Sequence, residues 1–247
     1  MRTDFQQFYV KPENVRSDHF VVDGDEFKHA VKVLRKQTGD SLAAVDGKGR
    51  LYSGTIRSIE KAQLTVSLGH SADNVGEPRL KVTLAQAVLK GSHFDWVIEK
   101  GTEIGVSAFQ PLITKRSVVQ PGSRLSRYQL KALAAMKQCG RSRCPIVYEA
   151  AAFAQVLEHL MVDYIFIAHE QIASPAFHNV DLRNASQVLV CIGPEGGFTE
   201  QEFDLALQSG AIPLHLGPRR LRSETAALVA CTRILDDAGE LGQQSGT

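Results

Sequence analysis

The chain of 247 residues carries a formal net charge of +1, and 43% of its residues are hydrophobic and 22% charged. These totals are typical of a globular protein and exclude a strongly polycationic binder, although they allow local basic patches. No apolar run approaches the ~20 residues that span a bilayer, and the first residues lack a signal-peptide core. We therefore expect a cytoplasmic protein without a membrane segment.

The cysteines and histidines give no sign of a metal site. The four cysteines show no Cys-x-x-Cys spacing, and the eight histidines form no His-x-x-x-His pair with a third ligand. Cys191 falls in a strand pattern and Cys231 in a helix pattern, where a buried thiol behaves as a small hydrophobe. We expect reduced, structural cysteines and no bound metal.

The N-terminal part of the chain is rich in short strand patterns joined by turns that contain glycine. Asp46-Gly47-Lys48-Gly49 predicts a hairpin, because Asp-Gly tolerates the positive φ angles of a tight turn. The predicted strands are Phe20–Asp23, a stretch from Ser41 to Ile59, and Ala62–Leu68, with one short helix at Glu26–Leu34. Such closely spaced strands favour a small barrel, a shape that is often used to bind RNA or oligonucleotides. The polar stretch His70–Pro78 is the candidate linker.

After Arg79 short apolar runs alternate with helical patterns, which predicts an α/β domain with a mostly parallel sheet covered on both faces. Sheets of this kind bind ligands at the carboxyl ends of their strands. The predicted strands are Val82–Leu89, Phe109–Ile113, Ile146–Tyr148, Tyr164–Ala168, Val188–Ile192 and Ile212–Leu216. The predicted helices run from the N-cap Ser92 to Glu103, from Leu125 to Cys139, and from Glu200 to Ser209.

The stretch "IGPEGGFTEQEF", Ile192 to Phe203, leads from a strand through a glycine-rich turn into a helix. Thr199 and Glu202 have the spacing of a capping box, and carboxylates in the first turn already complement the positive helix end. A phosphate would meet like charges there, whereas phosphate loops leave bare N–H groups for the anion. The glycines therefore favour a neutral or cationic guest, and the alternative is a tight connection without a ligand.

A second Gly-Pro turn occurs in "LHLGPRRLRSETAALVA", Leu214 to Ala230. Its basic loop contains Arg219, Arg220 and Arg222 and leads to Ser223, the predicted N-cap of an apolar helix. Because both Gly-Pro loops follow strands of one sheet, they can line one pocket. The arginines are explained either by contact with a polyanion or by solvation at the surface.

Two further stretches contain candidate functional residues. In "VLKGSHFDWVIEKGTEIG", Val88 to Gly105, helical spacing favours core packing for Trp96, the only tryptophan. In "KQCGRSRCP" the basic residues Lys137, Arg141 and Arg143 lie around a helix end. Capping of the helix and binding of phosphate explain these three residues equally well.

Taken together, these motifs resemble those of the small-subunit (16S) ribosomal RNA uridine-N3 methyltransferases of the SPOUT, or α/β-knot, superfamily. The resemblance rests on "IGPEGGFTEQEF" with "LGPRRLRSETAALVA", and on "KGSHFDWVIEKGTEIGV", "QCGRSRCP" and "VLRKQTGD". It implies a PUA-like β-barrel RNA-binding domain at residues 1–73 and a methyltransferase domain with a trefoil knot at residues 74–247. It further implies S-adenosylmethionine as cofactor, small-subunit ribosomal RNA or the assembled subunit as partner, and a homodimer formed through the knot domain.

The resemblance also implies the site residues. Those carried over to the cofactor site are Leu89, Ile192, Gly193, Pro194, Glu195, Gly196, Gly197, Leu216, Gly217, Leu221, Arg222 and Thr225. Arg35, Arg141, Arg143 and Arg219 are the RNA-binding candidates. Two positions depart from the family pattern: Lys137-Gln138-Cys139 replaces Glu-Gln-Ser, and Arg220 replaces an aliphatic residue.

Methylation at uridine N3 requires removal of the imide proton, because the neutral nitrogen has no available lone pair. Glu195 and Glu224 are candidate bases, and Arg222 and Arg143 are candidate charge stabilisers. The uridine must also leave its stack to expose N3. The alternatives are methylation of the ribose 2'-hydroxyl and a non-catalytic RNA-binding protein of ribosome assembly.

Overall fold

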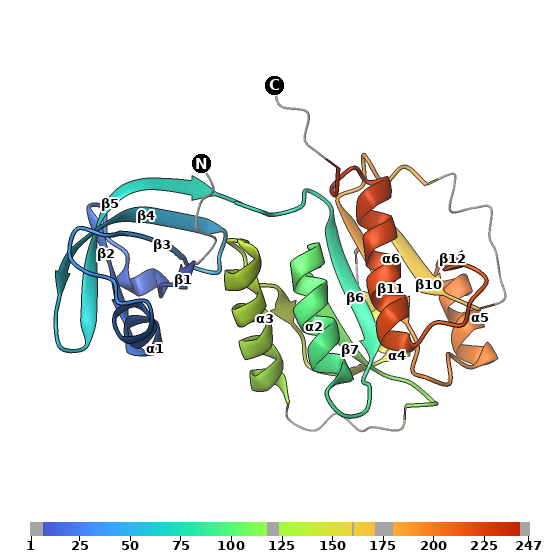
Figure 1. Ribbon diagram of the computed structural model, residues 1–247. Helices are drawn as coiled ribbons and strands as arrows, with labels where there is room; N and C mark the ends of the chain where they lie inside the picture. The colour runs from blue at the N-terminus through green and yellow to red at the C-terminus, as the bar shows by residue number, and fades with distance from the viewer. Residues whose placement is uncertain (1–6, 118–123, 160, 171–179, 243–247) are drawn as a thin grey trace. The chain divides into compact units, whose positions relative to one another are not determined.

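The computed structural model describes residues 7–117, 124–159, 161–170 and 180–242 (Figure 1). Its residue contacts divide the chain into two compact units. The first unit is Met1–Glu77 with Leu133–Cys144, and the second is Pro78–Ala132 with Pro145–Thr247. The segment Leu133–Cys144, which sequence reasoning placed in the methyltransferase part, therefore contacts the N-terminal residues more than the rest.

The first unit contains a five-stranded sheet in the order β1-β3-β4-β5-β2. Its pairs are antiparallel except for β1 with β3, and the β4–β5 pair has register shifts at Ser53/Gly54 and Ile56/Ser58 that add curvature. The strands are β1 (Phe8–Tyr9), β2 (His19–Asp23), β3 (Ser41–Val45), β4 (Arg50–Ile59) and β5 (Gln63–Asp73). The hairpin predicted at Asp46–Gly49 is confirmed, because it joins β3 to β4.

Two expectations for this unit need correction. The predicted helix at Glu26–Leu34 starts earlier, as α1 (Gly24–Lys28), and continues as a π-helical segment, η2 (His29–Val33). A short 3₁₀ segment, η1 (Pro12–Asn14), precedes β2. The candidate linker His70–Pro78 is half strand, because β5 pairs with β4 as far as Asp73. Backbone hydrogen bonds to β4 thus override the polar composition of that stretch.

The second unit contains a seven-stranded sheet in which every pair is parallel, in the order β12-β10-β11-β6-β7-β8, with β9 also paired to β7. The six predicted strands are confirmed, and the short β9 was not foreseen. The strands are β6 (Lys81–Ala87), β7 (Ala108–Ile113), β8 (Ile146–Val147), β9 (Ala151–Ala152), β10 (Tyr164–Ala168), β11 (Gln187–Ile192) and β12 (Ile212–Leu214).

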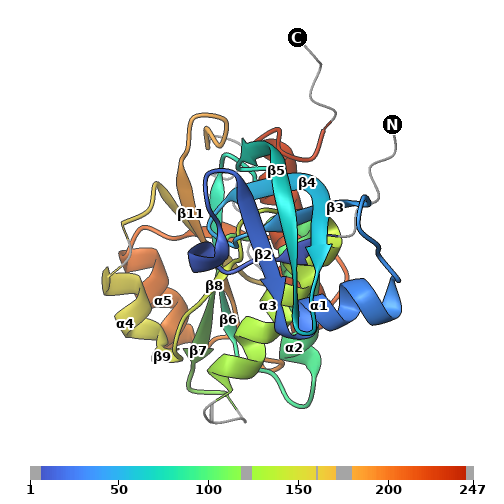
Figure 2. The same ribbon diagram turned by 90° about the vertical axis from the view of Figure 1, so that its left-hand side faces the viewer.

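Helices cover both faces of this sheet (Figures 1 and 2). On one face α6 (Ser223–Asp237) packs against β6 and β11 and against α2 (His93–Ile104). On the other face α4 (Phe153–His159) and α5 (Glu200–Gln208) share a core with Leu189 and Cys191 of β11. Alternate residues of β11 therefore face opposite helix layers, which explains its continuous apolar run. The predicted helix α3 (Leu125–Cys139) is confirmed to the residue.

Burial explains the behaviour of three residues in this unit. Cys191 and Cys231 are fully buried, as expected, and burial raises the pKa of the Cys231 thiol to about 12. These thiols are therefore inert packing groups. The prediction of core packing for Trp96 is wrong, because this side chain is 42% exposed on α2. The helical spacing was right, but Val97 and Ile98, both buried, form the inner face instead.

The path of the chain after β11 determines where the functional site lies. The strand β12 lies at the sheet edge beside β10, whereas α6 begins beside the central strands β6 and β11. The segment from His215 to Arg222 must therefore return across the carboxyl ends of the strands (Figure 1). This return brings the two Gly-Pro turns to the same edge of the sheet, as the sequence predicted. No helix in the described part of the chain is long and apolar enough to cross a membrane.

Candidate active site

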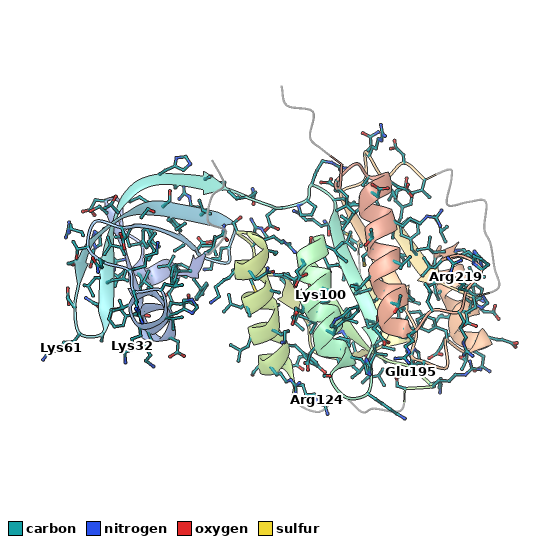
Figure 3. All side chains as sticks on the ribbon, in the orientation of Figure 1. Lys32, Lys61, Lys100, Arg124, Glu195 and Arg219 are labelled. Atoms are coloured by element: carbon teal, nitrogen blue, oxygen red, sulfur yellow. The ribbon has the colours of Figure 1, made fainter. Side chains whose placement is uncertain are left out.

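A cavity of about 660 Å³ opens at the carboxyl ends of β10, β11 and β12. Two loops form most of its wall: the first glycine loop, Gly193–Phe198, and the second glycine loop, His215–Arg222. The ends of β10 and the first residues of α2 and α6 complete it. Figure 3 labels one charged side chain of each loop, Glu195 and Arg219.

The first glycine loop is fixed by hydrogen bonds to its own backbone carbonyls. Arg116 donates to the carbonyl oxygens of Gly196, at 2.7 Å, and Phe198, at 3.2 Å. The Gly197 N–H donates to the carbonyl of Pro194 at 2.8 Å, with Gly197 at a φ of 70° that favours glycine. A Cβ at Gly193 would lie 3.0 Å from the Phe198 nitrogen, so this position admits no side chain without movement.

The capping box predicted after this loop is confirmed. The Glu202 N–H donates to the Thr199 hydroxyl at 3.2 Å, and the Thr199 N–H donates to the Glu202 carboxylate at 2.9 Å. The second oxygen of Glu202 accepts the Lys115 N–H at 2.8 Å. The start of α5 is therefore already occupied by a protein carboxylate, which disfavours an anion there.

A buried polar chain joins the two loops beneath the cavity. Gln86 of β6, which is fully buried, donates through Nε2 to the Ser223 hydroxyl at 2.8 Å. Ser223 in turn donates to the Gly193 carbonyl at 2.5 Å. The prediction of Ser223 as N-cap is wrong: the N-cap is Arg222, and Ser223 is the first helical residue. Its hydroxyl turns inward to Gly193, which the local sequence pattern does not reveal.

Among the described contacts of the second glycine loop, Arg233 of α6 donates to the His215 carbonyl at 3.1 Å. Gly217 has a φ of 100°, and its N–H donates to Nδ1 of His215 at 3.4 Å. Arg219 and Arg220 are exposed, and Arg220 forms an ion pair with Glu170 at 3.3 Å. Arg222 is also exposed and lines the cavity. The basic groups thus point away from the protein interior, where they remain accessible to a polyanion.

The mouth of the cavity contains a pair that sequence reasoning missed. Nδ1 of His93, at the start of α2, lies 3.4 Å from a carboxylate oxygen of Glu224 in the first turn of α6. The Glu224 side chain is only 13% exposed, whereas that of His93 is 51% exposed. The pairing was not visible in the sequence, because 131 positions separate the two residues and only the packing of α2 on α6 brings them together.

Most of the predicted site residues meet at this cavity. The ones that line it are Ile192, Gly193, Pro194, Glu195, Gly197, Leu216, Gly217, Leu221, Arg222 and Glu224. Three others do not: Leu89 is buried, Gly196 contacts Arg116, and Thr225 is exposed on α6. The sequence patterns did not predict His169 and Glu170 as cavity residues, because these two residues at the end of β10 belong to no recognisable motif.

The four candidate RNA contacts lie in different settings. Arg141 is buried and forms an ion pair with Glu77 at 2.8 Å, in which both side chains are at most 4% exposed. This placement argues against a phosphate contact, because breaking the ion pair would leave the Glu77 carboxylate buried and unpaired, at a large cost in free energy. Arg143 and Arg35 are exposed, and Arg143 donates to the Asn74 side chain at 3.0 Å. Arg219 belongs to the second glycine loop.

Family models and known proteins match nearly the whole chain. A model described as the RNA methyltransferase domain matches residues 76–235, and one described as the RNA methyltransferase PUA domain matches residues 22–69. The ribosomal RNA small subunit methyltransferase E of Bacillus subtilis is 31% identical over 244 residues, which cover 93% of this chain and 95% of the relative. The protein of the same name from Synechocystis is 32% identical over 91% of this chain and 75% of the relative.

The chain belongs to the ribosomal RNA small subunit methyltransferase E family. A solved member from Neisseria gonorrhoeae, bound to S-adenosylmethionine, has a TM-score of 0.83 at 30% identity and covers 94% of this chain and 97% of its own. A Legionella pneumophila methyltransferase, also with that cofactor, has a TM-score of 0.83 at 28% identity, with coverages of 96% and 98%. The predicted family and fold class, a PUA-like domain before an α/β-knot methyltransferase domain, are confirmed.

The cavity suits the cofactor that members of the methyltransferase E family bind. Its volume falls within the range of small-molecule sites, and apolar side chains such as Ile192 and Leu216 alternate with backbone groups along its wall. The carboxylate of Glu195 complements a sulfonium cation, whereas that of Glu170 is ion-paired with Arg220. A Cβ at Gly197 would meet no protein atom within 4 Å, so this glycine leaves open space for a ligand. Among the described residues no cluster of His, Cys, Asp and Glu is arranged to hold a metal ion.

Proposed function

We propose that this protein methylates N3 of uridine in small-subunit ribosomal RNA, with S-adenosylmethionine as the methyl donor. The proposal is supported by one observation above the others: two glycine loops of a methyltransferase E chain line one cavity, and the helix start that follows the first loop is already occupied by the Glu202 carboxylate. When bound, the cofactor supplies an electrophilic methyl group on a sulfonium. The residues of the cavity must then bind the nucleobase, exclude water and take up its N3 proton.

Three charged residues of the cavity are candidates for that chemistry. Arg222 lies at the end of the second glycine loop and the start of α6, where its guanidinium can stabilise negative charge that develops on the uridine. Glu224 and Glu195 are the candidate bases, at the mouth and on the first glycine loop. Of these, Glu224 has the smaller exposure and already contacts His93. We assign Glu224 to proton handling and Glu195 to contact with the cofactor.

The remaining cofactor contacts follow from the same arrangement. The backbones of Gly193, Pro194 and Gly197, together with those of Leu216, Gly217 and Leu221, would hold the cofactor. Ile192 forms an apolar floor. Leu89, Gly196 and Thr225 do not line the cavity: Leu89 is buried, Gly196 contributes its carbonyl to Arg116, and Thr225 lies at the surface of α6.

Ribosomal RNA is proposed to contact exposed basic residues of each unit. In the first unit Arg35, Lys32 and Lys61 are exposed, and Figure 3 labels the two lysines. Arg143 lies beside the β3–β4 hairpin in the same unit. Arg219 is the candidate in the second unit. We place the boundary between the RNA-binding and methyltransferase domains at residues 73 and 74, a division that falls between the two family models.

Mass spectrometry of modified nucleosides tests the proposed reaction. Small-subunit RNA from cells that lack the gene is incubated with the purified protein and the cofactor, digested and analysed. We expect one new 3-methyluridine, located by mapping RNase fragments. A 2'-O-methylated nucleoside would instead support the ribose alternative, and binding to RNA without any methylated product would support a non-catalytic assembly protein.

We further propose a cytoplasmic homodimer formed through the second unit. The support is a pair of exposed apolar side chains on adjacent helices: Trp96 on α2, which is 42% exposed, and Val229 on α6, which is 39% exposed. Burial of this pair against a second copy would remove apolar surface from water. Analytical ultracentrifugation of the wild type and of Val229→Glu tests the interface. A wild-type protein that sediments with the mass of a single chain contradicts the proposed dimer.

A further inference from the structure

The contact of His93 with Glu224 brings together the two kinds of side chain that form a catalytic dyad. It joins a nearly buried carboxylate to an imidazole that is half exposed at the cavity mouth. A carboxylate oxygen lies 3.4 Å from Nδ1, and at this distance the two groups are not aligned for a hydrogen bond. Catalytic hydrogen bonds are often long or poorly aligned until substrate binds. Since Nδ1 faces Glu224, the second ring nitrogen, Nε2, is left to face away from it.

A carboxylate beside one ring nitrogen fixes the position of the proton in a neutral imidazole. The Nδ1–H form is favoured, because Nδ1 then donates to Glu224 and Nε2 keeps its lone pair. Nε2 is thereby prepared to accept a proton from a bound group. The same carboxylate stabilises the imidazolium after the proton has moved.

We propose that His93 accepts the N3 proton of the uridine and that Glu224 is its positioning residue. This rests on the proposed function of the cavity. The N3–H bond breaks, its proton moves to Nε2 of His93, and its electron pair remains on N3. That pair forms the bond to the transferred methyl carbon, whose former bond to sulfur breaks with its electrons on sulfur. The exposed imidazolium then returns its proton to water.

The choice of His93 as the base and of Glu224 as its positioning residue follows from a comparison of the ionisable groups that line the cavity. An imidazole is a stronger base than a carboxylate and is better matched to a weakly acidic imide near neutral pH. Glu195 lies on the first glycine loop and has no imidazole beside it in the described contacts. His169 also lines the cavity, but its ring packs against Phe203 with centroids 4.3 Å apart.

Two variants of His93 and one control variant test the catalytic step. In single-turnover assays on small-subunit RNA we expect His93→Gln to lower the methylation rate about 100-fold, the scale of a lost general base. Cofactor and RNA affinities should stay within about threefold, because the side chain only changes the chemistry. His93→Ala should recover rate when imidazole is added. His70→Gln, at an exposed position of the first unit, is the control and should match the wild type.

A spectroscopic measurement tests the positioning role independently of turnover. Nitrogen-15 spectra of the histidine rings, with His93 assigned by its loss in His93→Gln, report which nitrogen carries the proton. We expect the Nδ1–H form for neutral His93 in the wild type and a shift toward the Nε2–H form in Glu224→Ala. A His93 ring that already favours Nε2–H in the wild type overturns the assignment.

The outcomes separate this inference from the proposed function. If the wild type forms 3-methyluridine but His93→Gln keeps its rate within about threefold, His93 is not the base and the function stands. A large loss of rate that imidazole does not restore assigns His93 a structural role and also overturns the inference. If the wild type forms no 3-methyluridine, the proposed function fails, whatever the ring spectra show.

Discussion

The two glycine loops have the same local sequence pattern and different physical roles. Each follows a parallel strand, turns at Gly-Pro and leads into a helix. The first is held by Arg116 from outside and by Ser223 from beneath, and ends in a capping box. The second contains exposed arginines, and its helix begins at an N-cap, Arg222, whose side chain makes no capping hydrogen bond.

From this difference we infer that the two loops contribute differently to binding at one cavity. The first loop presents fixed backbone groups, which suits a cofactor that must be held in one orientation. The second loop also lines the cavity with Leu216, Gly217 and Leu221, and its exposed arginines add cations that suit contact with a polyanion. A pattern shared by two loops therefore does not imply that the loops act alike. Substitutions that loosen the first loop or neutralise the second test the distinction.

The largest effect is expected for Gly193→Ala, because its Cβ would lie 3.0 to 3.2 Å from backbone atoms of Gly197 and Phe198. Backbone atoms cannot rotate away, so the loop must shift, and we expect the free energy of unfolding to fall by roughly 1–3 kcal/mol. Cofactor affinity, measured by calorimetry, should fall at least tenfold. Gly196→Ala is the matched control, since its Cβ would make only an ordinary contact with Arg116 at 3.5 Å. Equal behaviour of the two variants would show that the first loop is not rigid.

A smaller loss is expected for Ser223→Ala, which removes the hydroxyl between Gln86 and Gly193. The Gln86 amide is fully buried and would lose a partner, at a cost of about 1–3 kcal/mol in the free energy of unfolding. Because the Gly193 carbonyl is released, cofactor affinity should fall severalfold. Ser209→Ala, on an exposed helix end, should change stability by less than about 0.5 kcal/mol. If Ser223→Ala is destabilised but keeps its cofactor affinity, the hydrogen bonds from Gln86 through Ser223 to Gly193 contribute to folding and not to cofactor binding.

Sequence reasoning reached the elements of the fold because their signals are local. The capping box at Thr199 and the helix Leu125–Cys139 follow from spacing along the chain, and both are present. The apolar run Val188–Ile192 likewise identifies a strand buried on both faces. Parallel strands also bring their carboxyl ends together, so the meeting of both loops was predictable without the exact strand order.

Contacts between distant segments escaped the same reasoning. The inward turn of the Ser223 hydroxyl depends on Gln86, a residue 137 positions earlier. The pairing of His93 with Glu224 depends on how α2 packs against α6. Arg141 looked like a surface cation because its motif is basic, yet Glu77 neutralises it in the interior. In each case the role of the residue depends on a partner that is distant in the sequence, and a local pattern cannot identify that partner.

A modest effect is expected for Arg116→Ala, which removes both side-chain hydrogen bonds to the carbonyls of Gly196 and Phe198. These bonds are solvent-exposed, so their loss should weaken cofactor binding only about threefold and leave the fold intact. Arg116→Lys should behave nearly like the alanine variant, because a lysine cannot span two carbonyls in the planar geometry of a guanidinium. Full affinity in Arg116→Lys would show that charge alone holds the first loop.

The smallest effect on the cofactor and the clearest effect on RNA are expected for Arg219→Ala. If Arg219 contacts one phosphate, the slope of log affinity against log salt concentration should flatten by roughly one unit. Cofactor affinity should change little, because the Arg219 side chain is exposed, although Arg219 is among the residues that line the cavity. Arg220→Ala is the control: Arg220 has an ion pair with Glu170, which competes with phosphate for its charge, so its slope should change less. RNA affinities of the three proteins at two or more salt concentrations measure both slopes. Equal slopes for the wild type and Arg219→Ala would leave Arg219 solvated in the complex and remove the RNA contact from the second glycine loop.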